Sequence, residues 1–255
     1  MTLDLAAVVR DGWRLWRRDR ALLAPLTGVL LFMPQWALLL LVPEAPRLGD
    51  GADQPAAVAA WGQAWAAWMA ANGGWFVAAT LLAQGATLAV AALYLAQPAV
   101  DVGGALRRAL RLLPRYLLAG IAIALPLAAF GWAATLVSVG LLLAMPAIFY
   151  ALGRSCLIAP VLVAEPRTPA LAALARSWTL TRGRGIAVAA LVGGLTAGGQ
   201  LVAAVVTAID HLLTTGGMGN PVTLAVVDAG AAAATWAAGL ALALVQVVVY
   251  RRLAR

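Results

Sequence analysis

The sequence contains no lysine, one cysteine (Cys156) and one histidine (His211), and only 11% of its 255 residues are charged. With a single cysteine, the chain can form neither an internal disulfide nor a metal site built from several cysteines. It also lacks the HExxH motif of metalloproteases, the Gly-x-Ser-x-Gly motif of hydrolases, a phosphate-binding loop and a close pair of carboxylates. We therefore expect no metal, no other cofactor and no enzymatic activity.

The shortage of charge also excludes an ordinary soluble domain, in which about a quarter of the residues are charged. Hydrophobic residues make up 64% of the chain, and the mean hydropathy is +0.91. A soluble fold of this size cannot cover so much apolar surface, so lipid must be the solvent. The net charge of +8 would otherwise indicate nucleic acid. Because the Arg residues flank apolar runs instead of forming one patch, we expect anionic lipid headgroups as partners and no nucleic acid.

Long apolar stretches are abundant, and a membrane-crossing helix needs about 20 such residues. The first stretch is longer than the apolar core of a signal peptide, about 7–15 residues, so we expect it to be retained. The stretch 116–163 is long enough for two crossings joined by a turn near Leu136–Gly140. The sequence thus predicts an all-α polytopic protein with six transmembrane helices. Their predicted ranges are 21–42, 75–98, 116–136, 140–163, 185–209 and 222–250.

The arginines predict how these spans are oriented. Four Arg-rich segments, 1–20, 101–115, 165–184 and the C-terminus, lie on one side of the membrane if the chain crosses it six times. Five or seven crossings would place one basic cluster on the opposite side. Since loops rich in basic residues stay in the cytoplasm, we expect the N- and C-termini to be cytoplasmic.

Three of the Arg-rich segments have the spacing of amphipathic helices that lie in the plane of the headgroups. The first covers residues 3–20 and the second 101–115. The third begins after Thr168, which we expect to be its N-cap, with Pro169 as its first helical residue. The predicted architecture is three transmembrane hairpins, each preceded by an interfacial helix. A weak sequence repeat agrees with it, because an offset of 68 residues matches Arg108 to Arg176.

The outer loop, 43–73, contains three Trp residues that share one face of a helix, Trp61, Trp65 and Trp68. We expect this amphipathic Trp helix to lie on the outer surface of the membrane. The alternative is a surface that binds a partner or gives access to lipid.

Small residues predict where the last two spans pack together. Gly194 and Gly198 form a GxxxG motif on the fifth span, and Gly230, Ala234 and Ala238 form a stripe on the sixth. Such residues let two helix backbones approach closely in a membrane. We therefore expect close contact within this hairpin.

Arg154 is the main candidate for a functional residue, because a charge inside an apolar span is costly and tends to be paired or functional. We expect a structural ion pair, in which a break at Pro160 brings Glu165 toward Arg154 or toward Arg176 and Arg182. A site for phosphate or a lipid headgroup is the alternative. For the intramembrane acid Asp228, on the sixth span, we expect a place near the outer headgroups or a hydrogen bond to another helix. Coupling to protons or cations is its alternative.

The fourth span closes with Arg154, Pro160 and Glu165, and an A-L-x-x-S-x-x-L-T-x-G pattern follows. The matching residues are Ala173, Leu174, Ser177, Leu180, Thr181 and Gly183. This region resembles the membrane domain associated with bacterial glycerophosphoryl diester phosphodiesterases, and related six-helix inner-membrane proteins. The resemblance implies a six-helix architecture in the bacterial inner membrane. The 255 residues contain no soluble phosphodiesterase domain, so that activity is not carried over.

The sequence therefore favours a non-enzymatic role in envelope or lipid organisation, through headgroups at the cytoplasmic face or through a protein partner. The alternatives are a small-solute or lipid transporter that uses Arg154, Glu165 and Asp228, and a membrane-embedded enzyme. A transporter predicts a polar cavity near Arg154 or Asp228. A scaffold predicts a packed, dry core with its Arg side chains facing headgroups.

Overall fold

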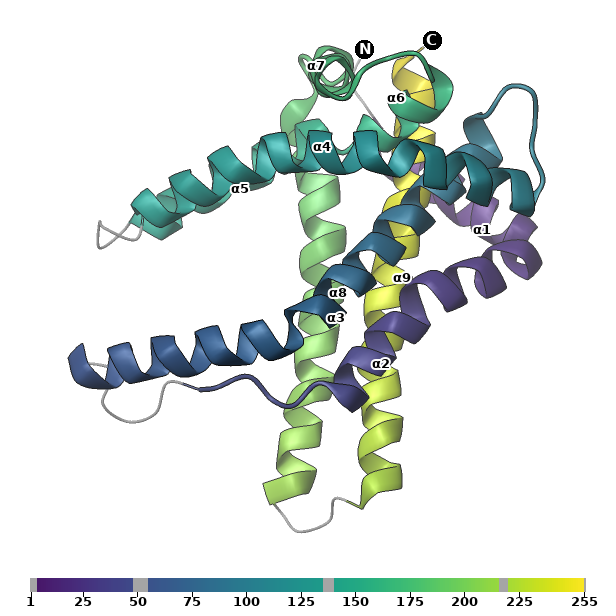
Figure 1. Cartoon of the computed structure of the whole chain (residues 1–255). Helices are drawn as coiled ribbons and strands as arrows, with labels where there is room; N and C mark the ends of the chain where they lie inside the picture. The colour runs from purple at the N-terminus through teal and green to yellow at the C-terminus, as the bar shows by residue number, and fades with distance from the viewer. Residues whose placement is uncertain (1–3, 48–54, 135–139, 216–219, 255) are drawn as a thin grey trace.

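The computed structural model describes residues 4–47, 55–134, 140–215 and 220–254 (Figure 1). These residues are helical apart from short connections, and no strand occurs among them. Six helical stretches are long and apolar enough to cross a membrane. The predicted all-α class with six spans is confirmed. The turn expected near Leu136–Gly140 falls on residues 135–139, outside the described ranges, and Gly140 is already helical.

The first hairpin consists of α1 (Leu5–Thr27), a π-helical stretch (Gly28–Phe32), α2 (Met33–Leu41) and α3 (Pro55–Leu95). The backbone of α1 leaves the helical region at Asp19, with φ −113° and ψ 18°. This kink separates the Arg-rich part of α1 from its apolar part, next to the predicted boundary between residues 20 and 21.

The Trp helix predicted for the outer loop is not a separate element, because it forms the first part of α3. Its indole rings stack, with centroids 5.9 Å apart for Trp61 and Trp65 and 5.3 Å apart for Trp65 and Trp68. The indole N–H groups of Trp61 and Trp68 donate to the carbonyls of Pro46 and Pro43, at 2.9 and 3.0 Å. This face therefore holds the connecting segment against α3.

The second hairpin consists of α4 (Val102–Ala134), α5 (Gly140–Ser155) and the short α6 (Ile158–Ala164). The interfacial helix predicted for 101–115 is not separate either, since it runs into the following span within α4. An end at residue 115 would leave backbone amides and carbonyls without partners near lipid, which a continuous helix avoids. By contrast, the span predicted for 140–163 is broken between α5 and α6.

The third hairpin, α8 (Gly185–Thr215) and α9 (Pro221–Leu253), follows the amphipathic α7 (Ala170–Leu180). The N-cap expected at Thr168 is wrong. Pro169 occupies that position in an extended conformation, and α7 has no side-chain cap because proline has no side-chain acceptor. The Thr168 amide donates to the Glu165 carbonyl in the preceding turn. After α7, Gly183 adopts a φ of 76°, a left-handed conformation that favours glycine.

The close approach of α8 and α9 differs from the predicted GxxxG contact. A Cβ atom built on Gly194 or Gly198 meets nothing within 4 Å, whereas one on Gly199 would lie 2.4 Å from Ala238 Cβ. Ala238 of the α9 stripe therefore makes the close contact, but its partner is Gly199, one position beyond the motif. Gly194 and Gly198 are one turn apart on a surface that α9 does not cover.

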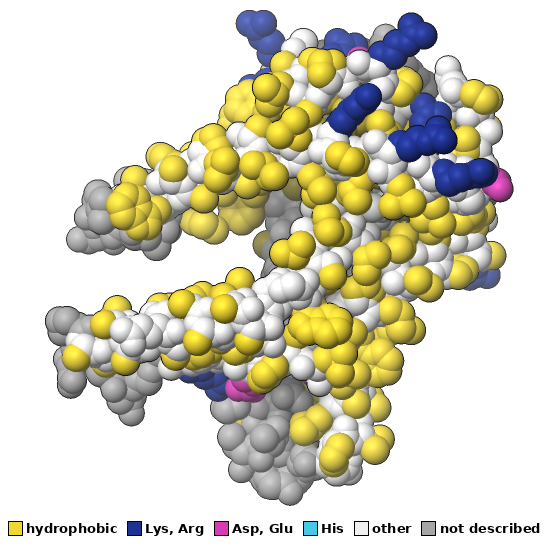
Figure 2. Space-filling model, viewed as in Figure 1, with side chains coloured by type: hydrophobic (Ala, Val, Ile, Leu, Met, Phe, Trp, Pro, Cys, Tyr) yellow, Lys and Arg dark blue, Asp and Glu magenta, His cyan; other side chains and the backbone are white. Residues whose placement is uncertain are grey.

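The hairpins diverge from the end of the molecule where both termini lie, and α4 and α5 run across the direction of α8 and α9 (Figure 1). The buried core sits where they converge. It consists mainly of α6, the last turns of α3 and α9, parts of α1 and the first half of α4. Arg side chains gather over the same region (Figure 2). We call it the Arg-rich end, defined by the Arg residues of α1, α4, α7 and the end of α9.

Candidate functional site

Arg154 lies in the last turn of α5, and its guanidinium group joins α5 to α7. Nε donates to Thr181 Oγ1 and Nη1 to the Tyr150 hydroxyl, both at 3.3 Å, and Nη2 donates to the Trp178 carbonyl. The guanidinium carbon also lies 4.7 Å from the centroid of the Trp178 ring. Within the described residues this guanidinium has no carboxylate partner.

Ser177 of α7 occupies the break between α5 and α6. Its hydroxyl donates to the Arg154 carbonyl at 2.6 Å and accepts from the Leu157 amide at 3.3 Å. In a continuous helix these two backbone groups would instead bond within the helix. Because α6 restarts at Ile158, Pro160 falls in its first turn, where its missing N–H costs nothing. The break expected at Pro160 therefore lies at Cys156–Leu157.

Of the two positions expected for Glu165, the one beside Arg154 is wrong and the ion pair with Arg176 is confirmed. Glu165 follows the last residue of α6 and pairs with Arg176 of α7, with Oε1 and Nε 3.3 Å apart. The Tyr250 hydroxyl of α9 donates to the same oxygen at 3.5 Å. Arg182 is exposed, and in the described part of the chain its side chain makes no ion pair.

Four Arg side chains donate to backbone carbonyls at or just beyond the C-terminal ends of helices. These carbonyls have no partner within their own helix, and a cation beside them also interacts favourably with the helix dipole. Arg154 serves α7 in this way, and Arg251 donates to the Tyr94 carbonyl at the end of α3 at 2.7 Å. Arg108 of α4 donates to the Val163 carbonyl in α6 at 2.9 Å, and Arg115 to that of Pro166 at 2.7 Å. Part of the positive charge therefore holds helices together.

The face of α4 that bears Arg108 and Arg115 carries a basic groove of about 670 Å³. We call it the α4 groove, and it is lined by Gln97, Val100, Gly104, Arg107, Arg108, Arg111, Leu112, Arg115 and Pro166. None of its four arginines forms an ion pair with a described carboxylate. The nearby Asp101 accepts the Gly104 amide at 2.8 Å near the start of α4. The groove is therefore a cationic surface with unused guanidinium donors.

Asp228 lies two turns into α9, where it is partly buried and takes part in an interaction. It is far along the chain from the residues that gather at Arg154. Among the residues that the structure describes, no three His, Cys, Asp or Glu residues lie close enough together to hold a metal ion.

Sequence reasoning placed the Arg side chains of 101–115 on a polar helical face but missed that Arg108 reaches the end of α6 and Arg115 the turn after it. The signal for that contact was weak, because an Arg that binds a carbonyl 51 or 55 positions away has no sequence pattern of its own. No protein-family model, no curated protein and no solved structure matches the chain. The resemblance carried by residues 154–183 therefore stays a prediction.

Proposed function

We propose that this protein is a non-enzymatic membrane protein that binds anionic lipid headgroups at its Arg-rich end and thereby organises lipid around it. The membrane is the bacterial inner membrane, and both termini lie in the cytoplasm. The observation that carries the proposal is the α4 groove, where four arginines line one surface and none of them pairs with a carboxylate of the described residues. Phosphate groups suit such a surface, because guanidinium binds them through two parallel N–H donors.

An apolar groove on the other side of α4 supports lipid as the source of the phosphate. This groove, about 620 Å³, lies between α1 and α4 and includes Pro25, Val29 and Leu106. Leu106 and Arg107 are adjacent in sequence, so apolar and cationic surfaces meet along the first turns of α4. A lipid offers both matching parts, an acyl chain and a charged headgroup, whereas a nucleic acid or a free anion offers only the charge.

The test compares lipid selection by variants of exposed arginines in nanodiscs of equal phosphatidylglycerol and phosphatidylcholine content. Native mass spectrometry of the extracted protein measures the ratio of the two lipids that stay bound. We expect an excess of phosphatidylglycerol in the wild type and a loss of most of that excess in Arg107→Gln/Arg111→Gln. Each arginine near a lipid surface contributes about 1 kcal/mol, or roughly a fivefold change in binding.

The single variant Arg111→Gln should lower the excess of phosphatidylglycerol by roughly fivefold. Arg47→Gln is its matched control, because it also removes one exposed arginine, one that is paired with Glu44, 2.9 Å away, outside the Arg-rich end. It should leave the lipid ratio unchanged. Equal binding of both lipids by the wild type, or equal effects of Arg111→Gln and Arg47→Gln, would overturn the proposal.

Lipid transfer across the membrane is the second candidate function, favoured by the hollow between the α4–α5 hairpin and the first part of α3 (Figure 2). A reconstituted protein that moves fluorescent phospholipid between leaflets, and loses this activity in Arg154→Ala, would favour transfer over organisation. An unchanged rate in that variant would remove Arg154 from any transfer pathway.

A further inference from the structure

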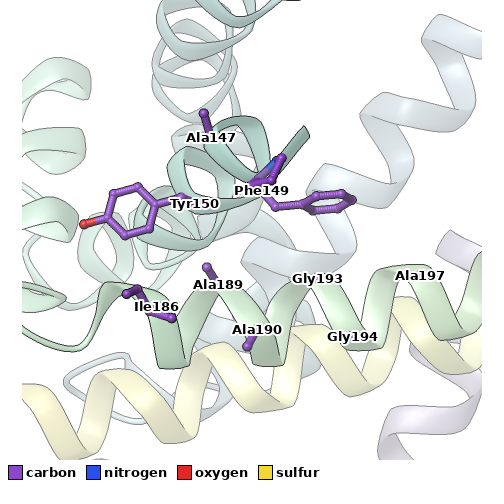
Figure 3. A pocket seen from close by; sticks show the side chains of 10 residues that line it. Ala147, Phe149, Tyr150, Ile186, Ala189, Ala190, Gly193, Gly194 and Ala197 are labelled. Atoms are coloured by element: carbon purple, nitrogen blue, oxygen red, sulfur yellow. The ribbon is translucent and has the colours of Figure 1, made fainter. Parts of the chain in front are cut away.

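An apolar groove of about 680 Å³ follows the contact between α5 and α8 (Figure 3), and it shares no lining residue with the α4 groove. We call it the α5–α8 groove. It is lined by Pro146, Ala147, Phe149, Tyr150, Ile186, Ala189, Ala190, Gly193, Gly194 and Ala197. Gly193 lies against the ring of Phe149, where a Cβ would come within 3.4 Å of the ring, whereas a Cβ on Gly194 would meet nothing within 4 Å (Figure 3). The small side chains of α8 thus leave an open groove beside the contact between the two helices.

The α5–α8 groove has the length of one lipid leaflet. From Ile186 to Ala197 it follows 11 steps of α8, and at 1.5 Å per residue this is roughly 16 Å. The hydrocarbon core of a bilayer is about 30 Å thick, so one acyl chain occupies about 15 Å of depth.

Arg154 stands at the end of the α5–α8 groove nearest the Arg-rich end. Tyr150 lines the groove, and its hydroxyl accepts the hydrogen bond from Arg154 Nη1. A guanidinium group has five N–H donors. The described structure uses three of them, one each on Nε, Nη1 and Nη2, which leaves one N–H on each terminal nitrogen. A pair of donors on the two terminal nitrogens matches two oxygens of a phosphate.

We propose that the α5–α8 groove binds a single phospholipid molecule, with one acyl chain between α5 and α8 and its phosphate on Arg154. The charge of the phosphate complements a guanidinium that has no carboxylate partner among the described residues. This site recognises the phosphate and the chain, not the net charge of the headgroup. It goes beyond headgroup selection by the α4 groove and does not depend on it.

Gly194→Leu tests the acyl-chain part of the site. A Cβ on Gly194 meets nothing within 4 Å, so the leucine fills the groove without displacing the backbone. Gly198→Leu is its matched control, because Gly198 has the same open surroundings one turn further along α8 but does not line the groove. Arg154→Gln tests the phosphate part, and Gly194→Leu keeps the proposal testable if that variant does not fold.

The measurement is native mass spectrometry after stepwise delipidation from nanodiscs of dioleoyl-phosphatidylcholine or dioleoyl-phosphatidylglycerol. We expect one retained molecule of either lipid in the wild type, in Gly198→Leu and in Arg107→Gln/Arg111→Gln. We expect at least a tenfold lower retained fraction in Gly194→Leu and in Arg154→Gln. Added dihexanoyl-phosphatidylcholine or inorganic phosphate should not displace the retained molecule.

Retention in Gly194→Leu equal to the wild type, or equal loss in Gly198→Leu, would overturn the inference. Displacement by inorganic phosphate would also overturn it, because the acyl chain would then contribute nothing. Failure of headgroup selection in Arg107→Gln/Arg111→Gln concerns the α4 groove alone, so the two proposals fail separately.

Discussion

The Arg-rich end and the opposite, apolar end of the molecule are built in different ways. Within the apolar window of the span Ala144–Ala164, which includes α6, 56% of the residues are buried, against 6% in that of Val102–Ala133. The side chains of Leu125 and Leu201, away from the Arg-rich end, are 66% and 67% exposed. Packing is therefore concentrated where the arginines are, and the apolar parts of the helices diverge.

The difference follows from lipid as the solvent. Apolar side chains gain little by leaving hydrocarbon for another apolar surface, so nothing forces the apolar ends of the hairpins together. Polar groups behave differently, because a backbone carbonyl or a guanidinium near lipid is costly without a partner. The contacts of Arg108, Arg115, Arg154 and Arg251 with carbonyls at helix ends show this directly. At the Arg-rich end, hydrogen bonds between Arg side chains and carbonyls at helix ends bring the helices together, and close packing follows.

The first prediction tests which side of the membrane the Arg-rich end occupies, and its outcome is all or none. Reporter fusions after Arg115, Arg184 and Arg255 should all report cytoplasm, because basic segments are retained there. The reporters are a phosphatase that is active only in the periplasm and a fluorescent protein that folds only in the cytoplasm. A single periplasmic fusion point would break the six-span topology and the assignment of the two ends.

The second prediction compares buried and exposed leucines. Leu162 of α6 is fully buried, so Leu162→Ala should lower the free energy of unfolding by about 2–5 kcal/mol. Leu201→Ala, on the exposed face of α8, should change it by less than about 0.5 kcal/mol. Unfolding in detergent, followed by circular dichroism against denaturant, measures both. Equal losses would show that the apolar faces are covered in the folded protein.

The third prediction concerns the contact of α5 with α8 beside the Arg-rich end. A Cβ on Gly153 would lie 2.4 Å from Ala189 Cα, an overlap that only a shift of the helices relieves. Gly153→Ala should therefore destabilise the protein by about 1–3 kcal/mol. The same change at Gly198, where a Cβ meets nothing, should not lower stability. The melting temperatures of the two variants check this, and a drop of the same size in both would contradict it.

The fourth prediction separates two neighbouring arginines of α4. Arg108 donates to a carbonyl of α6, so Arg108→Gln should cost about 1.5–3 kcal/mol, as expected for a hydrogen bond to a charged group. Arg107 makes only a 3.4 Å contact with the Gly103 carbonyl of its own helix. Arg107→Gln should leave thermal stability within about 0.5 kcal/mol of the wild type and lower only lipid selection. The reverse order of the two stabilities would show that Arg108 serves lipid instead.

The six apolar spans could be predicted from the sequence because span length and Arg distribution are local properties that any sliding window detects. The break at Cys156–Leu157 could not, because a hydroxyl 20 residues further on, that of Ser177, accepts the Leu157 amide and so helps to create it. Pro160 indicated a helix break but not its position, since proline both interrupts a helix and occurs in the first turn of a new one. For Glu165 the sequence left two positions open, and the structure has its ion pair with Arg176 and not with Arg154.

The candidate site shows the same limit. The Arg-rich face of 101–115 follows from helical periodicity, and the α4 groove lies on it. The α5–α8 groove depends on which side of α8 faces α5. The positions of the glycines in the sequence do not indicate which side that is. Gly194 belongs to a motif typical of close packing, yet it lines a groove.

The last and smallest effect concerns Gln246, a polar exception within the packed core of the Arg-rich end. Its side chain is 7% exposed, and within the described structure Oε1 has no hydrogen-bond donor. An unsatisfied buried carbonyl is costly, whereas an apolar side chain of similar length gives up no bond. Gln246→Met should therefore raise the free energy of unfolding by about 1 kcal/mol, and Gln200→Met, at an exposed position on α8, should not. A loss of stability in Gln246→Met would mean that the amide is satisfied in the membrane, by water or by a lipid headgroup. The rule that polar groups at the Arg-rich end have hydrogen-bond partners would then also hold for the Gln246 amide in the interior of α9.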